Sequence, residues 1–502
     1  MAFFQRPRKS YISRLFTFLS PTTSNELRIH AHMLRCSICL SGLLLFSNWA
    51  QLAIAQSVFQ VSDFGAVGDG KTLATPALQR TVDAAAAAGG GEVELKPGVY
   101  LTGALFLKSH THLLLDRGAV VLGTTRKDLY PLVPTRAAGI EMQWPAALLN
   151  IAGQTDVSIE GQGTIDGDGD PWWKEFWDLV PAYESRGLRW AVDYDVQRPE
   201  LIRIYNSNSV RIGDGLMLRR SAFWTIHICY STHVVVAGVT VRDNDANGVR
   251  GPSTDGVDID SSSHVLVEKV DIENNDDGIC LKAGMNADGL RVDRPTQDVV
   301  IRDSIIREGI SGIAIGSDTA GGFKNIRVYG ITILGGVRYG IYLKSTRTRG
   351  GWTDNVMMSH IVMVGVATAI KIDLNYFPAF STPRIPSGIE RNLPPNLHAI
   401  PNYWRILTAP VDPVKGLPHF RDVTLKDIRA NGIGTAFSVN AAPDAPLVRF
   451  TLKDIRIDAE HAGSISHTQE WTFQNVTVHA RDGVPLKLEA VEQSHGAIQQ
   501  LR

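Results

Sequence analysis

Acidic residues gather in two short segments of this 502-residue chain that end alike, Thr-Asp-Gly at 254–256 and Asp-Asp-Gly at 276–278. Carboxylates held close together raise one another's pKa, so one can stay protonated beside an ionised neighbour. A protonated and an ionised carboxyl group in one cleft are the means of general acid and general base catalysis. Turn residues or structural calcium ligands are the alternative explanation for isolated Asp-Gly pairs. We favour catalysis because a repeat relates the two segments.

The repeat comprises five segments, each with a small residue followed by apolar residues one and three positions later. The small residues are Gly256, Gly278, Gly312, Gly340 and Ala369. An alternation with period two turns the apolar residues toward one side of a strand. In a solenoid, equivalent residues of successive coils stack about 4.8 Å apart. Asp255 and Asp277 are therefore predicted to be neighbours, with Asp276 beside them.

Short runs of β-branched residues, which must position these carboxylates, recur from residue 156 almost to the C-terminus, as in HVVVAGVTV at 233 and HVLVEKVDI at 264. Most of them are 21 to 34 residues apart, which is typical of an all-β solenoid. A propeller, a competing all-β fold, needs about 40 residues and four strands in each blade, which these repeats lack. The one helix that the pattern predicts, Thr75 to Ala88, would cover the open N-terminal end of the solenoid.

The N-terminal region has the pattern of a signal peptide. Arg35 precedes the apolar run CSICLSGLLLF at 36–46, and Ala53-Ile54-Ala55 provides a small-residue cleavage site. We expect residues 1–55 to be a leader, with Met33 as a possible true start, and residues 56–495 to form one domain. An uncleaved anchor helix is the alternative, although polar residues interrupt the run. The expected location is secreted or periplasmic, with no stable membrane insertion after cleavage.

The composition excludes several classes of protein. With 44% hydrophobic residues and a formal charge of −1, the chain can bury a large core and lacks the basic charge of a general nucleic-acid-binding protein. The four cysteines include no two C-x₂-C pairs for zinc, so we expect no metal and no cofactor. After cleavage only Cys229 and Cys280 remain, which we expect to be buried thiols rather than a disulfide.

The chain resembles glycoside hydrolase family 28, the polygalacturonase-like enzymes. The resemblance rests on Ser253-Thr254-Asp255, on Asp276-Asp277 within NNDDGICLKAG, and on the segments DFGAVGDGKT (63–72) and GQGTIDGDGDPWW (161–173). It implies a right-handed parallel β-helix and hydrolysis of a galacturonic-acid-containing pectic polysaccharide or oligosaccharide, with inversion. It also implies that Asp276 is the general acid and that Asp255 and Asp277 position and deprotonate the attacking water.

Two positions depart from the family pattern. Ser311 replaces a histidine in a G-H-G-I-x-I-G-S segment, and Tyr342 replaces the arginine of R-I-K, whereas Lys344 remains. The resemblance implies that Ser311, Tyr342 and Lys344 bind substrate. A tyrosine cannot form the bidentate carboxylate clamp of an arginine. Arg338, Arg347 and Arg349 are candidates for the missing charge, and the substrate stays open between galacturonan, rhamnogalacturonan and a pectic side chain.

Two aromatic inserts interrupt the repeat, at 171–196 and 373–419. Long loops within a compact domain are usually either functional or disordered, and the aromatic residues of the second insert argue against disorder. A loop that walls one end of the cleft would favour exo-acting or debranching attack over endo cleavage. The four tryptophans of the first insert either stack on sugars or pack the insert onto the domain; they are Trp172, Trp173, Trp177 and Trp190.

Two other classes of function stay open. A polysaccharide lyase on the same type of helix would abstract a proton beside a uronate carboxylate, a chemistry that three aspartates suit less well. A non-catalytic carbohydrate-binding β-helix would not need stacked carboxylates at all, because their mutual repulsion is costly.

Overall fold

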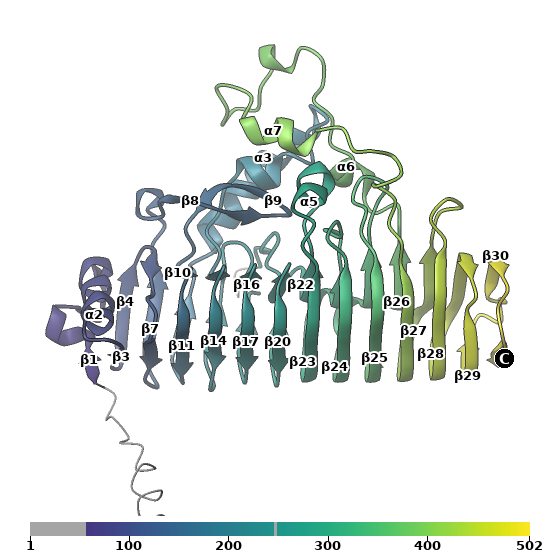
Figure 1. Ribbon diagram of the computed structural model, residues 1–502, viewed down its shortest axis with the longest axis horizontal. Helices are drawn as coiled ribbons and strands as arrows, with labels where there is room; N and C mark the ends of the chain where they lie inside the picture. The colour runs from purple at the N-terminus through teal and green to yellow at the C-terminus, as the bar shows by residue number, and fades with distance from the viewer. Residues whose placement is uncertain (1–56, 245–247, 502) are drawn as a thin grey trace, which may run out of the picture. The chain divides into compact units, whose positions relative to one another are not determined.

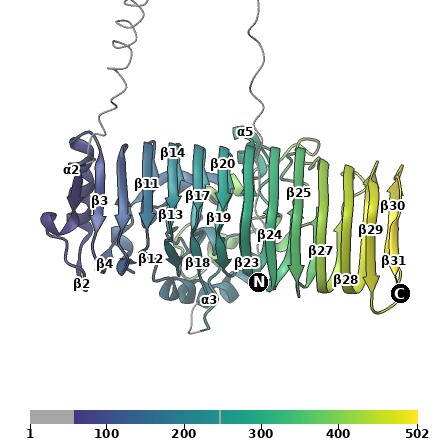
Figure 2. The same ribbon diagram turned by 90° about the horizontal axis from the view of Figure 1, so that it is seen from below.

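The strand repeat winds into coils whose strands stack in register in three parallel ladders (Figure 1). The computed structural model describes residues 57–244 and 248–501. Viewed from below, the strands of successive coils follow one another in chain order to β31 at the C-terminal end (Figure 2). This arrangement confirms the predicted all-β, right-handed parallel β-helix, the hand that parallel crossovers adopt.

Ladder A carries the repeat with the small residues. Its strands are β5 (Leu105–Phe106), β10 (Leu149–Ala152), β13 (Ile202–Tyr205), β16 (Ile226–Cys229), β19 (Val257–Asp260), β22 (Asp277–Lys282), the ends of β23 (Thr296–Ile315) and β24 (Phe323–Lys344), β26 (Thr368–Asp373), the ends of β27 (Arg421–Asn440) and β28 (Leu447–Gln469), and β30 (Lys487–Glu492).

Ladder B begins each coil. It consists of β1 (Val58–Gln60), β3 (Gly91–Leu95), β6 (Thr111–Leu115), β11 (Thr155–Gly161), β14 (Asn208–Gly213), β17 (Thr232–Ala237), β20 (Ser263–Glu268), the first parts of β23 and β24, β25 (Thr353–Val364), the first parts of β27 and β28, and β29 (Thr472–Ala480).

Ladder C closes the coil between the other two. It consists of β2 (Asp69–Leu73), β4 (Gly98–Thr102), β7 (Ala119–Gly123), β12 (Thr164–Asp166), β15 (Met217–Arg219), β18 (Thr240–Arg242), β21 (Asp271–Glu273), the middle parts of β23 to β25 and of β27 and β28, the second part of β29, and β31 (Ile498–Leu501). The last strand lies beyond residue 495, where the sequence pattern places the end of the domain.

The small residue of each repeat is required by the stacking of the coils. A Cβ atom on Gly256 would lie 2.5 Å from the carbonyl oxygen of Gly278, and one on Gly278 would lie 2.9 Å from that of Gly312. The apolar residues after the small one face the interior, and Val257, Ile259, Ile279, Leu281, Ile313 and Ile315 are all fully buried. The predicted register is thereby confirmed.

Helix α2 (Thr75–Ala87) packs against β1, β3, β5 and β6 and covers the N-terminal end, as predicted (Figure 1). The remaining short helices are the 3₁₀ turns Val61–Phe64, Lys127–Leu129 and Ile389–Arg391, with α5 (Asn286–Val292), α6 (Pro378–Ser381) and α7 (Asn402–Leu407). No helix among the described residues is long and apolar enough to cross a membrane. The predicted leader lies outside the described residues.

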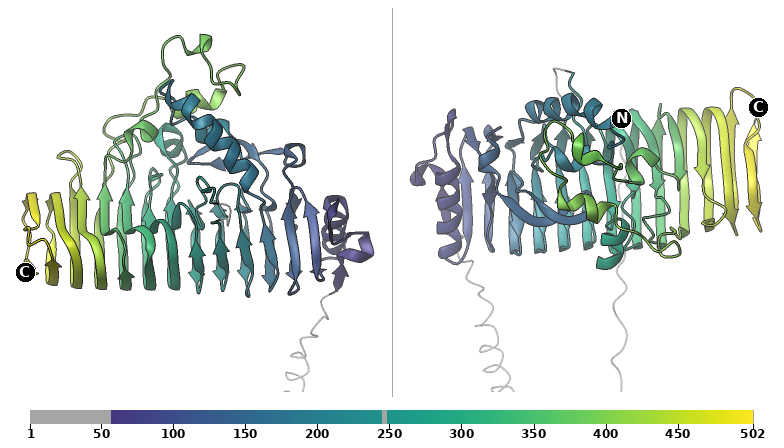
Figure 3. Two further views of the ribbon diagram at one scale, coloured as in Figure 1. Left: turned by 180° about the vertical axis from the view of Figure 1, so that it is seen from behind. Right: turned by 90° about the horizontal axis from the view of Figure 1, so that it is seen from above.

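The two inserts stand together on one side of the β-helix (Figure 3). The first insert contains α3 (Asp170–Glu184) and α4 (Val192–Asp195), which is a correction, because the sequence pattern predicts only the N-terminal helix. A helix with two prolines gives a weak periodic signal, and here the tertiary contacts stabilise it. The antiparallel hairpin of β8 (Leu132–Ala137) and β9 (Ile140–Pro145) lies beside the inserts.

A second hydrophobic core joins the inserts to each other. The rings of Trp190 and Trp404 meet edge to face at 5.2 Å. The carboxylate of Asp195 accepts hydrogen bonds from the Tyr403 hydroxyl at 2.6 Å and from the Trp404 indole at 3.0 Å. Trp172, Trp173 and Trp190 are buried, so these three pack the insert, whereas Trp177 is 42% exposed.

Candidate active site

The two acidic segments meet on the outer face of ladder A. Asp255 precedes β19, and Asp277 begins β22, the next strand of the ladder. The backbone N–H of Gly256 donates to the carbonyl oxygen of Asp277 at 2.9 Å, and the N–H of Asp277 donates to Oδ1 of Asp276 at 3.0 Å. The structure therefore brings the three aspartates together on adjacent coils.

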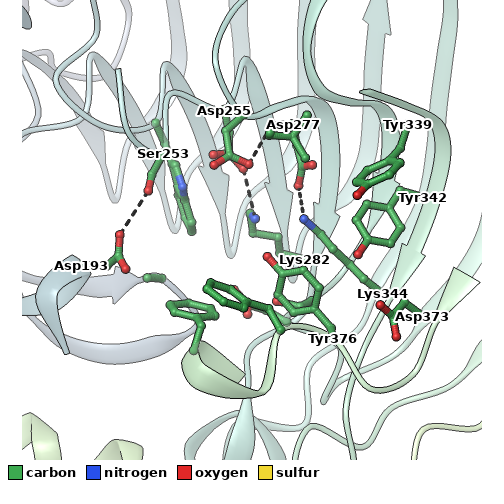
Figure 4. A pocket seen from close by; sticks show the side chains of 18 of the residues that line it. Asp193, Ser253, Asp255, Asp277, Lys282, Tyr339, Tyr342, Lys344, Asp373 and Tyr376 are labelled. Carbon is green, nitrogen blue, oxygen red and sulfur yellow. Dashed lines mark hydrogen bonds and ion pairs between the residues drawn. The ribbon is translucent and has the colours of Figure 1, made fainter. Parts of the chain in front are cut away.

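A cleft of about 490 Å³ contains all three aspartates. A carboxylate oxygen of Asp255 and one of Asp277 lie within 4.8 Å of each other. Both side chains are almost fully buried, whereas Asp276 keeps part of its surface open to the cleft. Figure 4 shows the carboxylates of Asp255 and Asp277 side by side, between Ser253 on one side and Tyr339 on the other.

Two lysines neutralise the buried carboxylates. Lys344 donates to Oδ2 of Asp277 at 2.7 Å, and the hydroxyl of Ser311 donates to Oδ1 of the same carboxylate at 2.6 Å. Lys282 lies 3.3 Å from Asp255 (Figure 4). It also lies 3.4 Å from Asp258. The Nζ of Lys282 is also 4.7 Å from the centre of the Trp224 ring.

Burial and the neighbouring charges shift the pKa values of the three aspartates in different directions. Burial, together with the charges of Asp255 and Asp277, raises the pKa of Asp276 well above its usual range. Burial acts the same way on Asp277, but Lys344, Lys282 and Ser311 outweigh it and hold the pKa of Asp277 below its usual value. Burial and the charge of Asp277 raise the pKa of Asp255, against the opposing charge of Lys282. One cleft thus holds two carboxyl groups whose pKa values are shifted in opposite directions, as a general acid and a general base require.

Ser311 and Lys344, which the resemblance implies bind substrate, both contact Asp277, and Lys344 also lines the cleft. Ser311 is fully buried, Lys344 is 4% exposed, and both bond to Asp277. Tyr342 lines the cleft but is only 3% exposed. The physical reason is the register of ladder A, which stacks Ser311 directly on Asp277 and so places its side chain against that carboxylate.

The three arginines considered for the missing charge have different positions. Arg338 lines the cleft. Arg347 forms an ion pair with Asp444, and both side chains are more than half exposed. Arg349 is buried and is paired with Asp318. Of these three, only Arg338 is placed to meet a ligand in the cleft.

Lys282 is a residue of the cleft that the sequence pattern did not lead us to predict. The residue four positions after the small one is Lys282 in DDGICLK and Lys344 in RYGIYLK. This shared position was the available signal, since the period-two alternation turns both lysines to the outer face. Asp258 was also missed; burial, with the charge of Asp255, raises its pKa well above the usual range.

Residues of both inserts and of the hairpin wall the cleft. They are Ala138, Arg189, Asp193, Tyr376, Phe377 and Phe380. The contacts that join the inserts, described above, therefore also hold this wall in place. Arg189 pairs with Asp193 at 2.5 Å and lies over the Phe377 ring at 5.6 Å.

Two buried clusters have the residue types of metal ligands, Asp255 with Asp277 and Cys280, and His227 with Cys229 and Asp260. Protein cations already occupy the carboxylates of both. Lys344 bonds to Asp277, and Arg136 bonds to Asp260 at 2.8 Å. A divalent ion would face these cations at close range, so neither donor set fits a metal well. Cys229 and Cys280 are free and buried, as predicted.

Comparison with known proteins agrees with this geometry. The model of glycosyl hydrolases family 28 matches residues 133–392, which include both acidic segments. A probable polygalacturonase of Vitis vinifera is 28% identical over 449 residues, covering 87% of this chain and 81% of the relative. An exo-poly-alpha-D-galacturonosidase of Dickeya chrysanthemi is 26% identical, over 64% of this chain and 57% of the relative. A hyperthermoactive exopolygalacturonase from Thermotoga maritima has the same fold, with a TM-score of 0.66 and 22% identity over 88% of this chain and 92% of that one.

Proposed function

The chain belongs to family 28 of the glycosyl hydrolases and is a glycoside hydrolase, and we propose that it cleaves a galacturonic-acid-containing pectic polysaccharide or oligosaccharide. In this proposal, hydrolysis inverts the anomeric carbon and starts from the end of the sugar chain. The observation that carries the proposal is the opposite displacement of two pKa values in one cleft, upward for Asp276 and downward for Asp277. The relatives named above, a polygalacturonase and an exo-galacturonosidase, support the substrate class.

Each aspartate has a role in this mechanism. Asp276 holds a proton and gives it to the glycosidic oxygen as the bond to the anomeric carbon breaks. Asp277 is ionised and takes a proton from the water that attacks the opposite face of that carbon. Asp255 lies within 4.8 Å of Asp277 and orients the same water. Lys344 and Ser311 are positioning residues, because they act on the substrate through Asp277.

Attack from the chain end is supported by the wall of the cleft. The two inserts pack against each other through Trp190, Trp404 and Asp195, and their residues line the same cleft as the carboxylates. A walled cleft accepts a chain end more readily than the middle of a polymer. The leader pattern at 1–55 supports a secreted or periplasmic location, where such a polymer is met.

The test is to incubate the protein from Gln56 onward with polygalacturonate and, separately, with rhamnogalacturonan. We expect new reducing ends without ultraviolet absorbance, short products from the first minutes, and inverted anomeric configuration by proton NMR. Asp276→Asn should lower kcat about 10²- to 10⁴-fold, the usual contribution of a general acid. Asp303→Asn, which changes an exposed aspartate of β23 that does not line the cleft, is the matched control.

Three outcomes would contradict parts of the proposal. Ultraviolet-absorbing products would indicate a lyase. Reducing ends from rhamnogalacturonan alone would move the substrate to that polymer. Binding to either polymer without turnover, unchanged in Asp276→Asn, would indicate a non-catalytic carbohydrate-binding β-helix.

A further inference from the structure

Among the described residues, five cations line the cleft; three of them lie within 3.3 Å of a carboxylate of the protein, and a fourth, Lys371, is 4.0 Å from Asp373. The three close pairs are Arg189 with Asp193, Lys282 with Asp255, and Lys344 with Asp277. Their charges are largely neutralised inside the protein. The two other cations, Arg338 and Lys371, are therefore the ones available to an anionic ligand.

Arg338 and Lys371 both contact one aromatic ring, that of Tyr339. The guanidinium carbon of Arg338 lies 5.1 Å from the centre of the Tyr339 ring, and Nζ of Lys371 lies 4.6 Å from it. Within the described part of the chain, no hydrogen bond or ion pair involves the Arg338 guanidinium. Among the described residues, Asp373 is the one carboxylate that forms an ion pair with Lys371; the distance of 4.0 Å is at the outer limit of such a pair, and Asp373 also lines the cleft. Cation–π contact positions both groups without using their N–H donors.

The register of ladder A relates Lys371 to the position where the family pattern has an arginine. Tyr342 on β24 stacks directly on Lys371 of β26, one coil further along. Two ammonium groups lie close to the Tyr342 ring, with Nζ of Lys344 at 5.2 Å and Nζ of Lys371 at 5.4 Å from its centre. An arginine at position 342 would add a third positive charge beside them. A neutral tyrosine at position 342 therefore avoids the charge repulsion that an arginine there would have with Lys371.

We propose that Arg338 and Lys371 bind the carboxylate of a galacturonate unit in the cleft, so that the carboxylate-binding charge is displaced by one coil from position 342. This inference rests on the proposed function, and it adds the residues that select an acidic sugar. Lys371 is on β26, the third strand after β22 in ladder A. At the usual strand spacing, β26 is about 14 Å from β22, the strand that Asp277 begins. The bound carboxylate therefore lies on the side of the C-terminal coils.

A site of this kind discriminates between acidic and neutral sugars. A carboxylate accepts charge-assisted hydrogen bonds from both cations, whereas a primary alcohol in the same place leaves their charges uncompensated. Selectivity should then appear as a difference in KM between galacturonate oligomers and the same oligomers after reduction of their carboxyl groups.

The test compares Arg338→Gln, Lys371→Gln and the double variant on these two substrates. Each single change should raise KM for galacturonate oligomers about tenfold to a hundredfold, the cost of one hydrogen bond to a charged group. KM for the reduced oligomers and the thermal unfolding midpoint should stay close to wild type. Arg347→Gln and Lys426→Gln, which remove cations outside the cleft, are the matched controls.

A compensating variant tests whether the carboxylate-binding charge is displaced from position 342 to Lys371. In the Lys371→Gln background, Tyr342→Arg should recover part of the lost affinity for galacturonate oligomers. In the otherwise wild-type protein, the same change should lower the unfolding midpoint, because it brings a third charge next to two lysines.

The outcomes separate this inference from the proposed function. Wild-type protein that cleaves galacturonate oligomers, with variants that are unchanged or equally impaired on both substrates, would overturn the inference alone. Wild-type protein that cleaves only the reduced oligomers would overturn both. Calorimetry of oligomer binding to Asp276→Asn, with and without Lys371→Gln, measures affinity independently of turnover.

Discussion

Lys344 donates a 2.7 Å hydrogen bond to Asp277 across two coils of the β-helix, from 67 residues further along the chain. Both groups are almost completely buried, and removal of one partner of such a pair leaves the other charge uncompensated. The ionised state of the proposed base thus depends on a residue of another coil.

Replacement of Lys344 by methionine should move the acidic limb of the kcat/KM profile to higher pH. Asp277 must be ionised to act as a base, and its pKa is held low in part by Lys344. Without that charge its pKa rises, so activity is lost at a higher pH as the solution is acidified. We expect kcat at the optimum to fall about tenfold or more. Lys344→Arg retains the charge and should retain most of the profile; an unmoved acidic limb in Lys344→Met would contradict the role of Lys344.

Ser311→Ala should lower kcat and leave KM unchanged. Ser311 is fully buried and its hydroxyl bonds to Asp277 rather than facing the cleft. The loss of one hydrogen bond to a charged group corresponds to about 1.5–3 kcal/mol, and we expect it to appear in the chemical step. Steady-state kinetics on galacturonate oligomers measure the split. A raised KM with an unchanged kcat would instead support the substrate contact that the family resemblance implies.

The stability of the protein should decrease at alkaline pH because of a buried histidine. Burial disfavours the charged form of His227, but Glu200, at 3.0 Å, and Asp260 raise its pKa well above the usual value. A raised pKa contributes stability that is complete below the unfolded value of about 6.5 and is lost as pH rises through the folded value. The pKa values of Glu200 and Asp260 are lowered despite burial, so their contributions are lost at acidic pH.

Thermal unfolding between pH 3 and pH 10 measures this dependence. We expect the highest midpoint at about pH 4–6.5, between the unfolded pKa values of the carboxylates and of histidine. His227→Gln should lower the free energy of unfolding at pH 6 by about 3–5 kcal/mol, the cost of breaking a buried ion pair. In this variant, the unfolding midpoint should decrease much less between pH 6 and pH 9 than it does in the wild-type protein. A variant that keeps the wild-type slope would show that other groups cause it.

Trp404→Ala should loosen the wall of the cleft and lengthen the products. Trp404 is fully buried, contacts Trp190 and donates to Asp195, so it joins the two inserts. Truncation of a buried tryptophan costs about 3–5 kcal/mol. We expect a lower unfolding midpoint and, by chromatography, longer early products from polygalacturonate. Trp177→Ala, an exposed tryptophan of the same first insert, is the control; short products from Trp404→Ala would argue against the wall as the cause of exo action.

The sequence alone determined the coil and its register. Inward residues such as Ile279 and Leu281 repeat with period two, and the preceding glycine is required because the backbone of the next coil lies 2.9 Å from its missing Cβ. These local constraints recur in every coil, so they can be recognised in a single sequence. They were sufficient to predict that Asp255, Asp276 and Asp277 lie together, and the family resemblance added their proposed roles.

Only the tertiary structure decided which groups face which. Lys344 meets Asp277, Ser311 turns to the same carboxylate, and Lys371 lies beside Tyr342, because the four coils that carry these residues are stacked. The pairing of Asp195 with Trp404 spans 209 residues, and no periodicity links the two inserts that it joins. Side-chain partners across coils and between inserts depend on long-range packing, and this packing sets the protonation of the aspartates and the closure of the cleft.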